Sequence, residues 1–404
     1  MKVVALETVL SQDFPNLMWV HIHTDEGLVG LGETFYWPKA VAAYLHEAVE
    51  PYLLGRDPLA IEHHNRVLLQ SFLASGNAGV ETRGHSAIDI ALWDIFGQSA
   101  GLPIYQLLGG RSRDRVRIYN TCTGYEHLHE PVSFATPGWT TPRRGRRGRH
   151  EDLEDATERP GELAQELLED GITAMKIWPF DPFAAAYQGM HLSAADIERG
   201  VEPFRRIRQA VGSRMDVMLE FGGLWNLPTA MRIARAVEPF EPFWFEDPFR
   251  MDNIDALAEF ARATRVPVAA SEMLGTRFAF RELLERRAVG VVMLDLGWIG
   301  GLSEAKKVAA MAEAYKLPVA PHDCTGPVVW TASMHLSVSL PNAVIQEAVR
   351  AYYSGWYREV LTALPTVENG FAAPPEGVGL GTKLQPDFLR RSTTQVRRGS
   401  DQRV

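Results

Sequence analysis

The chain has 404 residues, of which 46% are hydrophobic, and this size suits a barrel of about 250 residues together with a smaller domain. Its formal net charge of −9 argues against nucleic acids and anionic membranes as partners. Two cysteines, Cys122 and Cys324, exclude a disulfide framework and favour a cytoplasmic protein, and no apolar run is long enough to predict a membrane-spanning helix.

The first 115 residues predict a small α+β domain. Three segments alternate or run apolar as antiparallel strands do: 3–9, 17–23 and 28–34. Three further segments carry apolar side chains at helical spacing: 38–53, 58–73 and 84–110. Gly97 and Gly101 mark the end of the last helix, because glycine commonly follows the final turn.

From residue 116 onward, strand-like and helix-like segments alternate. The first two strands are predicted at 116–121 (VRIYNT) and 173–178 (TAMKIW). Helical spacing recurs at 194–211, 228–237, 252–263, 277–287 and 302–315. This rhythm predicts an α/β fold in which residues 116–360 form a TIM-like (β/α)7–8 barrel.

Two segments depart from the rhythm. Residues 133–160 contain a basic run, RRGRRGR, followed by an acidic run, and they predict a flexible insertion after the first barrel strand. No aromatic residues interleave the basic run, which makes a nucleic-acid site there a weak alternative. Residues 361–404 predict an extended C-terminal segment that packs back on the first domain, with a disordered tail, RRSTTQVRRGSDQRV.

Polar residues recur at the ends of six successive apolar strand-like runs, 23 to 27 residues apart. They are Glu220, Glu246, Glu272, Asp295, His322 and Glu347. A single Glu after a strand is more often a helix cap or a surface charge, but unrelated charges have no reason to recur at the same strand terminus. Because the C-terminal ends of barrel strands converge at one mouth, the series predicts an active site there.

These residue types indicate two kinds of chemistry. Three acids at one mouth predict a site for a divalent cation, and a hard cation such as Mg2+ prefers oxygen ligands. An Asp beside a His predicts a proton-transfer pair, since the carboxylate fixes the tautomer of the imidazole and supports its charged form. A metal-dependent hydrolase is a poorer alternative, because such sites usually carry several His ligands and the series has only His322.

The chain resembles the enolase superfamily, and within it the mandelate racemase subgroup. The resemblance covers nearly the whole chain, through SAIDIALWDIFGQSAGLPIYQLLGG (86–110), MKIW (175–178), FEDP (245–248), SEM (271–273), LDLGWIGGLSEAKKVAAMAEA (294–314) and PHD (321–323). Each motif is weak alone, whereas their order and spacing are specific. The resemblance implies an N-terminal α+β capping domain over residues 1–115, completed by the C-terminal segment.

The resemblance also implies roles for the polar series. Glu220, Glu246 and Glu272 would hold one Mg2+ per subunit, and the cation would chelate the carboxylate of a small-molecule substrate. His322, paired with Asp295, would be the general base or acid. Glu347 would hydrogen-bond the substrate carboxylate or the enediolate oxygen. Lys176 stands at the first lysine of the Lys-x-Lys motif of the family and is a fourth catalytic candidate.

Two departures from the pattern of the family bear on the reaction. The ligand on the third strand is commonly Asp with Asn two places on, whereas this chain has Glu220 and Gly222. The second lysine of the Lys-x-Lys motif is replaced by Trp178. In the racemases that lysine is a base on the opposite face of the substrate, so its absence argues against racemisation and favours a dehydratase.

Substrate contacts are the least readable part of the sequence. The candidates at the barrel mouth and on the capping domain are Trp178, Asn120, Tyr36, Arg83 and Trp298. Trp178 is a candidate to pack on the apolar face of a sugar chain, and its alternative is a filler of the barrel mouth. Arg83 is a candidate clamp for a distal hydroxyl or carboxylate, and its alternative is an ordinary surface arginine.

The sequence therefore predicts a cytoplasmic Mg2+-dependent acid-sugar dehydratase that removes water from an aldonate or similar hydroxy acid. The product would be a 2-keto-3-deoxy acid. The nearest alternative is a cycloisomerase, epimerase or racemase that uses the same enolate, and a more distant one is a non-catalytic binding protein. Barrels of this kind often assemble symmetrically, so a homo-oligomer is expected.

Overall fold

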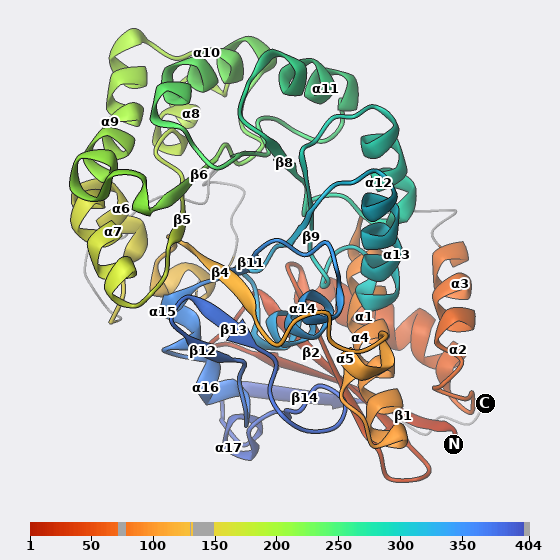
Figure 1. The fold of residues 1–404 in the computed structure, drawn as a ribbon. Helices are drawn as coiled ribbons and strands as arrows, with labels where there is room; N and C mark the ends of the chain where they lie inside the picture. The colour runs from red at the N-terminus through yellow and green to blue at the C-terminus, as the bar shows by residue number, and fades with distance from the viewer. Residues whose placement is uncertain (72–77, 130, 132–148, 400–404) are drawn as a thin grey trace.

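The computed structural model describes residues 1–71, 78–129, 131 and 149–399, and it combines an N-terminal sheet-and-helix domain with a barrel (Figure 1). The N-terminal strands are antiparallel: β1 (Val3–Ser11), β2 (Leu17–Thr24) and β3 (Val29–Phe35). The helices that follow are α1 (Pro38–Tyr44), η1 (Leu45–Val49), α2 (Glu50–Leu53), α3 (Ile61–Ser71), α4 (Val80–Ala100) and α5 (Ile104–Leu107). These elements correspond to the strands and helices expected from apolar periodicity.

One face of this sheet packs against α4. Met18, Val20 and Ile22 alternate along β2 and share a core with Ile88 and Ile95 of the helix. The backbones of β3 and α4 approach closely, because a Cβ on Gly32 would lie 1.9 Å from the Ala87 carbonyl oxygen. Glycine at this position therefore lets α4 lie directly on the sheet, which fixes where the start of α4 meets the barrel.

Within the described residues, eight parallel strands form the barrel and confirm the predicted fold class. They are β4 (Val116–Thr121), β5 (Ala174–Ile177), β6 (Asp216–Glu220), β7 (Phe245–Glu246), β8 (Val268–Ala270), β9 (Val291–Leu294), β10 (Val319–Pro321) and β11 (Gln346–Ala348). Each strand from β4 to β10 pairs with the next, and β11 returns to pair with β4. A bridge joins Val319 of β10 to Ala343, in the segment that leads into β11.

Helices lie outside the ring of strands, as α9 to α13 do in Figure 1. The elements between the barrel strands are η3 (Tyr125–Leu128), α6 (Asp152–Glu158), α7 (Pro160–Glu169), α8 (Asp181–Tyr187), α9 (Ala194–Val211), η4 (Gly212–Arg214), α10 (Leu227–Val237), η5 (Glu238–Phe240), α11 (Ile254–Ala263), α12 (Thr276–Glu285), α13 (Gly301–Ala314) and α14 (Pro327–Ser339). After β11 come α15 (Arg350–Tyr353) and α16 (Tyr357–Val360).

The inside of the barrel is a layer of apolar side chains. Its members are Tyr119, Ala174, Met218, Trp244, Ala269, Met293, Ala320 and Ile345. Val291, two positions before Met293 on β9, belongs to the same cluster. Side chains at i and i+2 of a strand share a face, so the next inward position toward the C-terminal end follows from this layer. Those positions hold Thr121, Lys176, Glu220, Glu246, Ser271, Asp295, His322 and Glu347.

The C-terminal segment divides between the two domains. The hairpin of β12 (Thr366–Glu368) and β13 (Phe371–Ala373) pairs antiparallel with barrel strand β4 through β13. This part of the segment therefore packs on the barrel, whereas the sequence predicted packing on the N-terminal domain. Next, α17 (Pro386–Leu389) places Phe388 against Trp19, with ring centroids 5.0 Å apart. The tail then forms β14 (Thr394–Arg398), which pairs antiparallel with β1.

The prediction of a disordered tail is therefore wrong for residues 391–399, while 400–404 lie outside the described residues. Charge and low hydrophobicity indicated disorder, but a strand at the edge of a sheet gains its hydrogen bonds from the neighbouring backbone. In β14 the register pairs Val396 with Val9 and Thr394 with Ser11.

The predicted flexible insertion also contains ordered structure. Residues 133–148 lie outside the described residues, but α6 begins at Asp152, whose side chain is buried. Arg350 donates two hydrogen bonds to Asp152, of 2.8 and 2.7 Å, and Asn120 donates a third of 2.8 Å. The acidic run thus supplies a buried partner for a buried arginine beside β11, which sequence composition alone does not reveal.

We expect Asp152→Asn to lower the free energy of unfolding by about 3–5 kcal/mol, because it leaves the buried Arg350 charge without its main partner. The side chains of Arg350 and Asp152 are 3% and 0% exposed. A matched control is Asp387→Asn, since Asp387 pairs with Arg390 in a bridge whose side chains are 91% and 70% exposed. That change should cost less than about 1 kcal/mol. Equal losses in urea denaturation would contradict the prediction.

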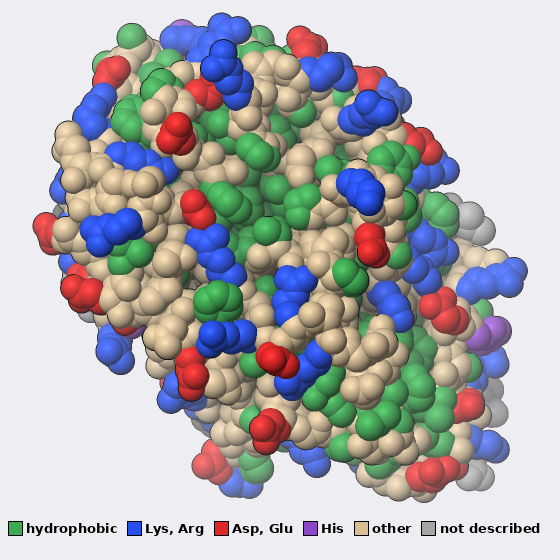
Figure 2. Space-filling view, in the orientation of Figure 1, with side chains coloured by type: hydrophobic (Ala, Val, Ile, Leu, Met, Phe, Trp, Pro, Cys, Tyr) green, Lys and Arg blue, Asp and Glu red, His purple; other side chains and the backbone are tan. Residues whose placement is uncertain are grey.

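Basic and acidic side chains are interspersed over the face seen in Figure 2, with hydrophobic side chains between them. Among the described residues, no helix is both long and apolar enough to cross a membrane.

Candidate active site

A His–Asp pair lies at the C-terminal ends of two neighbouring strands. His322 follows β10 and Asp295 follows β9, and both side chains are buried. The Nδ1 of His322 lies 2.7 Å from Asp295 Oδ2. Because a carboxylate only accepts hydrogen bonds, this contact places the proton on Nδ1 and leaves Nε2 as the reactive nitrogen.

The reactive nitrogen of His322 faces two other groups. Cys324 Sγ lies 3.4 Å from Nε2, and Glu347 Oε2 lies 3.7 Å from it. Burial disfavours the charged imidazole, but the carboxylates of Glu347 and Glu272 and the bond to Asp295 outweigh burial, so the pKa of His322 is raised well above its ordinary value. The surrounding carboxylates therefore stabilise the imidazolium that forms when Nε2 accepts a proton.

Lys176 stands among three carboxylates inside the barrel. Its Nζ bonds Glu246 and lies 2.9 Å from Glu347 Oε1 and 3.3 Å from Glu220 Oε2. Burial works against its charge, but these carboxylates raise the pKa of Lys176 well above its ordinary value. In this arrangement Lys176 is an ammonium and a hydrogen-bond donor, and it does not act as a base.

Glu347 is held as a carboxylate. Burial favours its neutral form, yet Lys176 and His322 lower the pKa of Glu347 to about 2. Thr121 Oγ1 donates a hydrogen bond to Oε1, and the backbone N–H of Asp323 donates one of 2.9 Å to Oε2. An ionised Glu347 accepts hydrogen bonds only, so the donor available at this point of the mouth is Lys176.

Four carboxylates crowd the other side of the mouth. Burial and mutual repulsion raise the pKa of Glu220 to about 7 and raise those of Glu246, Asp247 and Glu272 above their ordinary values. Within the described residues, buried oxygens Asp247 Oδ1 and Glu272 Oε2 have no hydrogen-bond partner. Buried carboxylates without enough partners are unfavourable as anions, and a divalent cation would compensate their charge.

These oxygens fit an oxygen-preferring cation in kind and in charge. Among the described residues, Glu220, Glu246 and Glu272 do not all bring one carboxylate oxygen within 4.8 Å of the other two. The predicted ligands therefore do not form a closed shell. Lys176 pairs with Glu220 and Glu246, and the side chains of these two glutamates also hydrogen-bond each other. Glu272 also stands one position beyond Ser271, the residue that occupies the inward register on its strand.

Three of the predicted substrate-binding residues meet over the His–Asp pair. The Arg83 guanidinium lies 4.5 Å from the ring centroid of Trp298 and 5.3 Å from that of Tyr36. The ring of Trp298 lies 5.4 Å from that of His322. Arg83 donates to the Phe35 carbonyl at 2.9 Å, and burial lowers the pKa of this guanidinium to about 10. The capping domain thus reaches the His322–Asp295 pair through β3 and α4.

The remaining two candidates separate. Trp178 is buried and stands two positions beyond Lys176, one residue past the end of β5. Asn120 points outward, because it alternates with the inward Tyr119 and Thr121. Its amide donates to Asp152 Oδ2, and its carbonyl oxygen accepts the Arg350 N–H at 2.9 Å. The assignment of Asn120 to substrate binding is therefore wrong, and Thr121 is the residue of β4 that faces the site.

Sequence reasoning missed three further residues beside the site: Thr121, Asp247 and Cys324. Thr121 follows from strict alternation along VRIYNT, so a signal for it existed. Asp247 is adjacent to Glu246, but it lies beyond the strand and takes a positive φ of 40°, which alternation does not predict. Ser271 Oγ donates to Asp247 Oδ2 at 2.6 Å and holds it at the mouth.

A buried acid, Glu33 of β3, joins the capping domain to the loop after His322. Its Oε1 accepts the backbone N–H groups of Val328 and Val329, in the first turn of α14, at 3.0 and 2.8 Å. The positive end of the helix suits a carboxylate, but burial dominates and raises the pKa of Glu33 to about 8.

We expect wild-type protein to lose stability relative to Glu33→Gln as pH rises from about 5 to 8. A raised pKa in the folded state means that the fold prefers protonated Glu33. Protonated Glu33 therefore contributes its full stabilisation at a pH below its pKa in the unfolded chain, and this stabilisation is lost as the pH rises toward its pKa in the folded protein. The relative loss should be on the order of a few kcal/mol. Parallel stability curves for both proteins across this range of pH would contradict the prediction.

Comparisons with known proteins agree with the geometry. Residues 2–109 match the family model described as the mandelate racemase/muconate lactonizing enzyme N-terminal domain, and 160–388 match the enolase C-terminal domain-like model. A crystal structure of an enolase of the mandelate racemase subgroup from Agrobacterium tumefaciens is 48% identical, covers 99% of both chains and has a TM-score of 0.88. An enolase structure from Sargasso Sea environmental sequencing is 40% identical over 100% of both chains, with a TM-score of 0.87.

Two curated relatives carry the names of specific activities. D-galactonate dehydratase of Ralstonia nicotianae is 30% identical over 394 residues, which span 95% of this chain and 92% of that protein. D-xylonate dehydratase of Haloferax volcanii is 30% identical over 384 residues, which span 95% of this chain and 86% of that protein.

Proposed function

We propose that this chain, which belongs to the mandelate racemase and muconate lactonizing enzyme family of the enolase superfamily, is a lyase that dehydrates a sugar acid. Its substrate class is an aldonate or a similar hydroxy acid, and its product is a 2-keto-3-deoxy acid. The observation that carries the proposal is the buried His322–Asp295 pair, which faces the same mouth as Lys176 and the carboxylate cluster. The names of the two curated relatives support this substrate class.

His322 is the general base of the proposed reaction. Its Nε2 removes the proton on the carbon next to the substrate carboxylate, while Asp295 holds Nδ1–H and stabilises the imidazolium. The imidazolium then donates this proton to the departing β-hydroxyl, which leaves as water. The resulting enol tautomerises to the keto acid, so that the elements of one water molecule are lost overall.

The other side chains prepare the substrate for proton removal. Glu220, Glu246 and Glu272, assisted by Asp247, would hold one Mg2+, and bound Mg2+ supplies Lewis-acid stabilisation of the charge that develops on the substrate carboxylate. Lys176 donates a hydrogen bond to that carboxylate. Glu347 positions Lys176 and His322. Arg83 and Trp298 contact the distal hydroxyl groups and exclude water.

Trp178 favours dehydration over racemisation in this site. It takes the position where a second lysine would provide an opposed base, and an indole cannot accept the α-proton. A single base on one face removes and returns a proton on that face only. We therefore assign Trp178 to packing against the carbon chain of the substrate.

The test is a screen of aldonates, aldarates and uronates with purified protein and Mg2+, read by keto-acid formation, with an EDTA control. We expect a keto acid from at least one aldonate and no product after EDTA treatment. Deuterium exchange at the α-carbon in D2O without loss of water, across the whole set, would overturn dehydration in favour of an epimerase or cycloisomerase. Sedimentation of the same preparation tests the expected homo-oligomer.

A further inference from the structure

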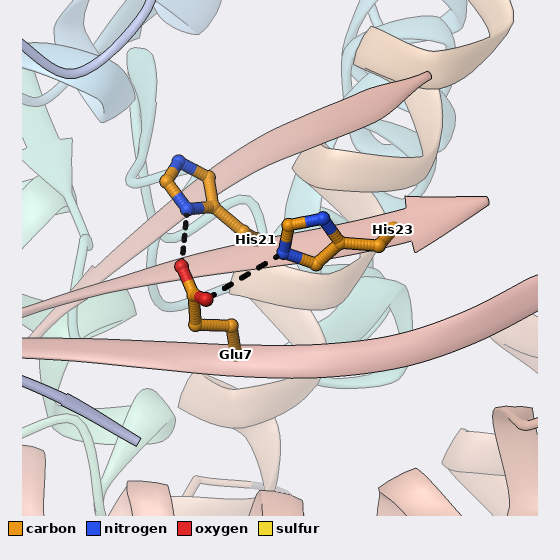
Figure 3. A group of neighbouring side chains, drawn as sticks. All are labelled: Glu7, His21 and His23. Carbon is orange, nitrogen blue, oxygen red and sulfur yellow. Dashed lines mark hydrogen bonds and ion pairs between the residues drawn. The ribbon is translucent and has the colours of Figure 1, made fainter. Parts of the chain in front are cut away.

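Two histidines and a glutamate form a compact group on the N-terminal sheet, away from the barrel mouth. Figure 3 shows both imidazoles of β2, His21 and His23, directed at the carboxylate of Glu7 on β1. Glu7 pairs with His21 across the two strands, and His23 lies two residues on, so alternation brings all three to one face. This face is opposite to the one that packs on α4, where Ile22 points.

The distances within the group suit a bound metal ion. His21 Nδ1 lies 2.9 Å from Glu7 Oε1, and His23 Nε2 lies 3.7 Å from Glu7 Oε2. Two ligand atoms that are each about 2.1 Å from a tetrahedral zinc ion lie roughly 3.4 Å apart. The two observed separations bracket this value. One potential ligand atom from each of the three residues falls within 4.8 Å of the other two.

The group is accessible and incompletely hydrogen-bonded. The side chains of Glu7, His21 and His23 are 15%, 13% and 21% exposed, which leaves a path for an ion and a position for water. Among the described residues, the buried His23 Nε2 has no hydrogen-bond partner. A buried imidazole nitrogen aimed at a carboxylate without a hydrogen bond is better satisfied by an ion between them.

We propose that Glu7, His21 and His23 form a second metal site, selective for zinc or a similar borderline divalent ion. Two neutral imidazoles and one carboxylate are a common zinc ligand set, and magnesium prefers oxygen ligands and makes a poor competitor. The ion would tie β1 to β2, the two inner strands of the four-stranded sheet. The site is chemically distinct from the carboxylate cluster of the barrel and does not depend on the proposed dehydratase activity.

Two features of the surroundings bear on this proposal. Arg398 of β14 lies across from Glu7 in the strand register, and a positive charge close to Glu7 would oppose cation binding. The side chain of Arg398 is exposed, so it can point into solvent. The alternative occupant of the group is a proton: the 2.9 Å contact of His21 Nδ1 with Glu7 Oε1 is a hydrogen bond, and the two histidines lower the pKa of Glu7 to about 2. A metal and a proton compete for the same nitrogen atoms.

Equilibrium dialysis against zinc distinguishes the two occupants. The full chain is stripped with chelator and dialysed against Zn2+ in millimolar Mg2+, which keeps the barrel carboxylates occupied, and bound zinc is measured by atomic absorption. The test variants are His23→Asn and Glu7→Gln. The control is His63→Asn, which removes an exposed histidine from α3 of the same domain. Circular dichroism verifies the fold of each variant.

We expect wild type and the His63 variant to bind one more zinc ion than the two test variants. The affinity lost should exceed the about 10- to 100-fold typical of losing an outer-shell partner, because each change removes a ligand. Cobalt bound to wild type should show the visible absorption band of an ion with a low coordination number, and both test variants should lack this band. Identical zinc isotherms in wild type and Glu7→Gln, which preserves side-chain shape, would overturn the proposal in favour of a proton-filled ion pair.

Discussion

Replacing His322 with asparagine is expected to lower kcat for dehydration by about 10²–10⁴-fold, the range usual for loss of a general acid or base. The reason is local: Nε2 is the reactive nitrogen that the bond to Asp295 leaves available on the imidazole. Asparagine retains a polar side chain at this buried position and leaves the neighbouring carboxylates in place. Steady-state kinetics on the aldonate found in the screen, with magnesium binding measured by calorimetry, test the prediction.

A buried histidine away from the mouth provides the control. His335 lies in α14, where its Nε2 is 3.1 Å from the Leu380 carbonyl oxygen, and burial lowers its pKa to about 4. His335→Asn should reduce stability and leave kcat of the folded protein near wild type. If His322→Asn keeps wild-type kcat, or loses activity only in proportion to its unfolded fraction, the assigned base is wrong.

Replacing Glu246 with glutamine is expected to lower activity by at least about 10³-fold and to weaken magnesium binding. Glu246 is fully buried, bonds Lys176, and accepts a 2.8 Å hydrogen bond from Trp244 Nε1. The amide removes one negative charge from the cation site and one partner from the lysine. Raising the magnesium concentration should recover part of the activity, because the amide oxygen remains a weak ligand.

Glu304 is a suitable control for this substitution. It is also a fully buried glutamate, but it pairs with Arg277 outside the barrel mouth. Glu304→Gln should cost stability while leaving the magnesium dependence of turnover unchanged. If Glu246→Gln shows the same magnesium activation curve as wild type, Glu246 is not a ligand.

The fold was predictable because its signals are local and repeated. Helical spacing and apolar runs mark nearly every element, and each strand from β6 to β11 has a polar residue of the series within two residues of its C-terminal end. The errors fall where a segment depends on distant partners. Strand β14 requires the edge of β1, and α6 requires the buried charge of Arg350, and neither requirement is visible within the segment itself.

The side chains that face the barrel mouth were predictable for a related reason. Alternation along a strand fixes which side chains face inward, and this rule accounts for Lys176, His322 and Glu347 as well as for the error at Asn120. The rule stops at the end of the strand, so it did not find Asp247. The distances among the carboxylates also escape sequence reasoning, because they depend on how these side chains pack around Lys176.

The pairing of β1 with β14 has a consequence for biosynthesis. The ribosome makes β14 only after β1 and the whole barrel, an interval of roughly 20–80 s at about 5–20 residues per second. Throughout that interval the outer edge of β1 presents unpaired backbone groups, which template association with other chains. Nascent chains stalled before residue 394 should therefore be the most prone to aggregate and the most dependent on chaperones, although their barrel is already complete.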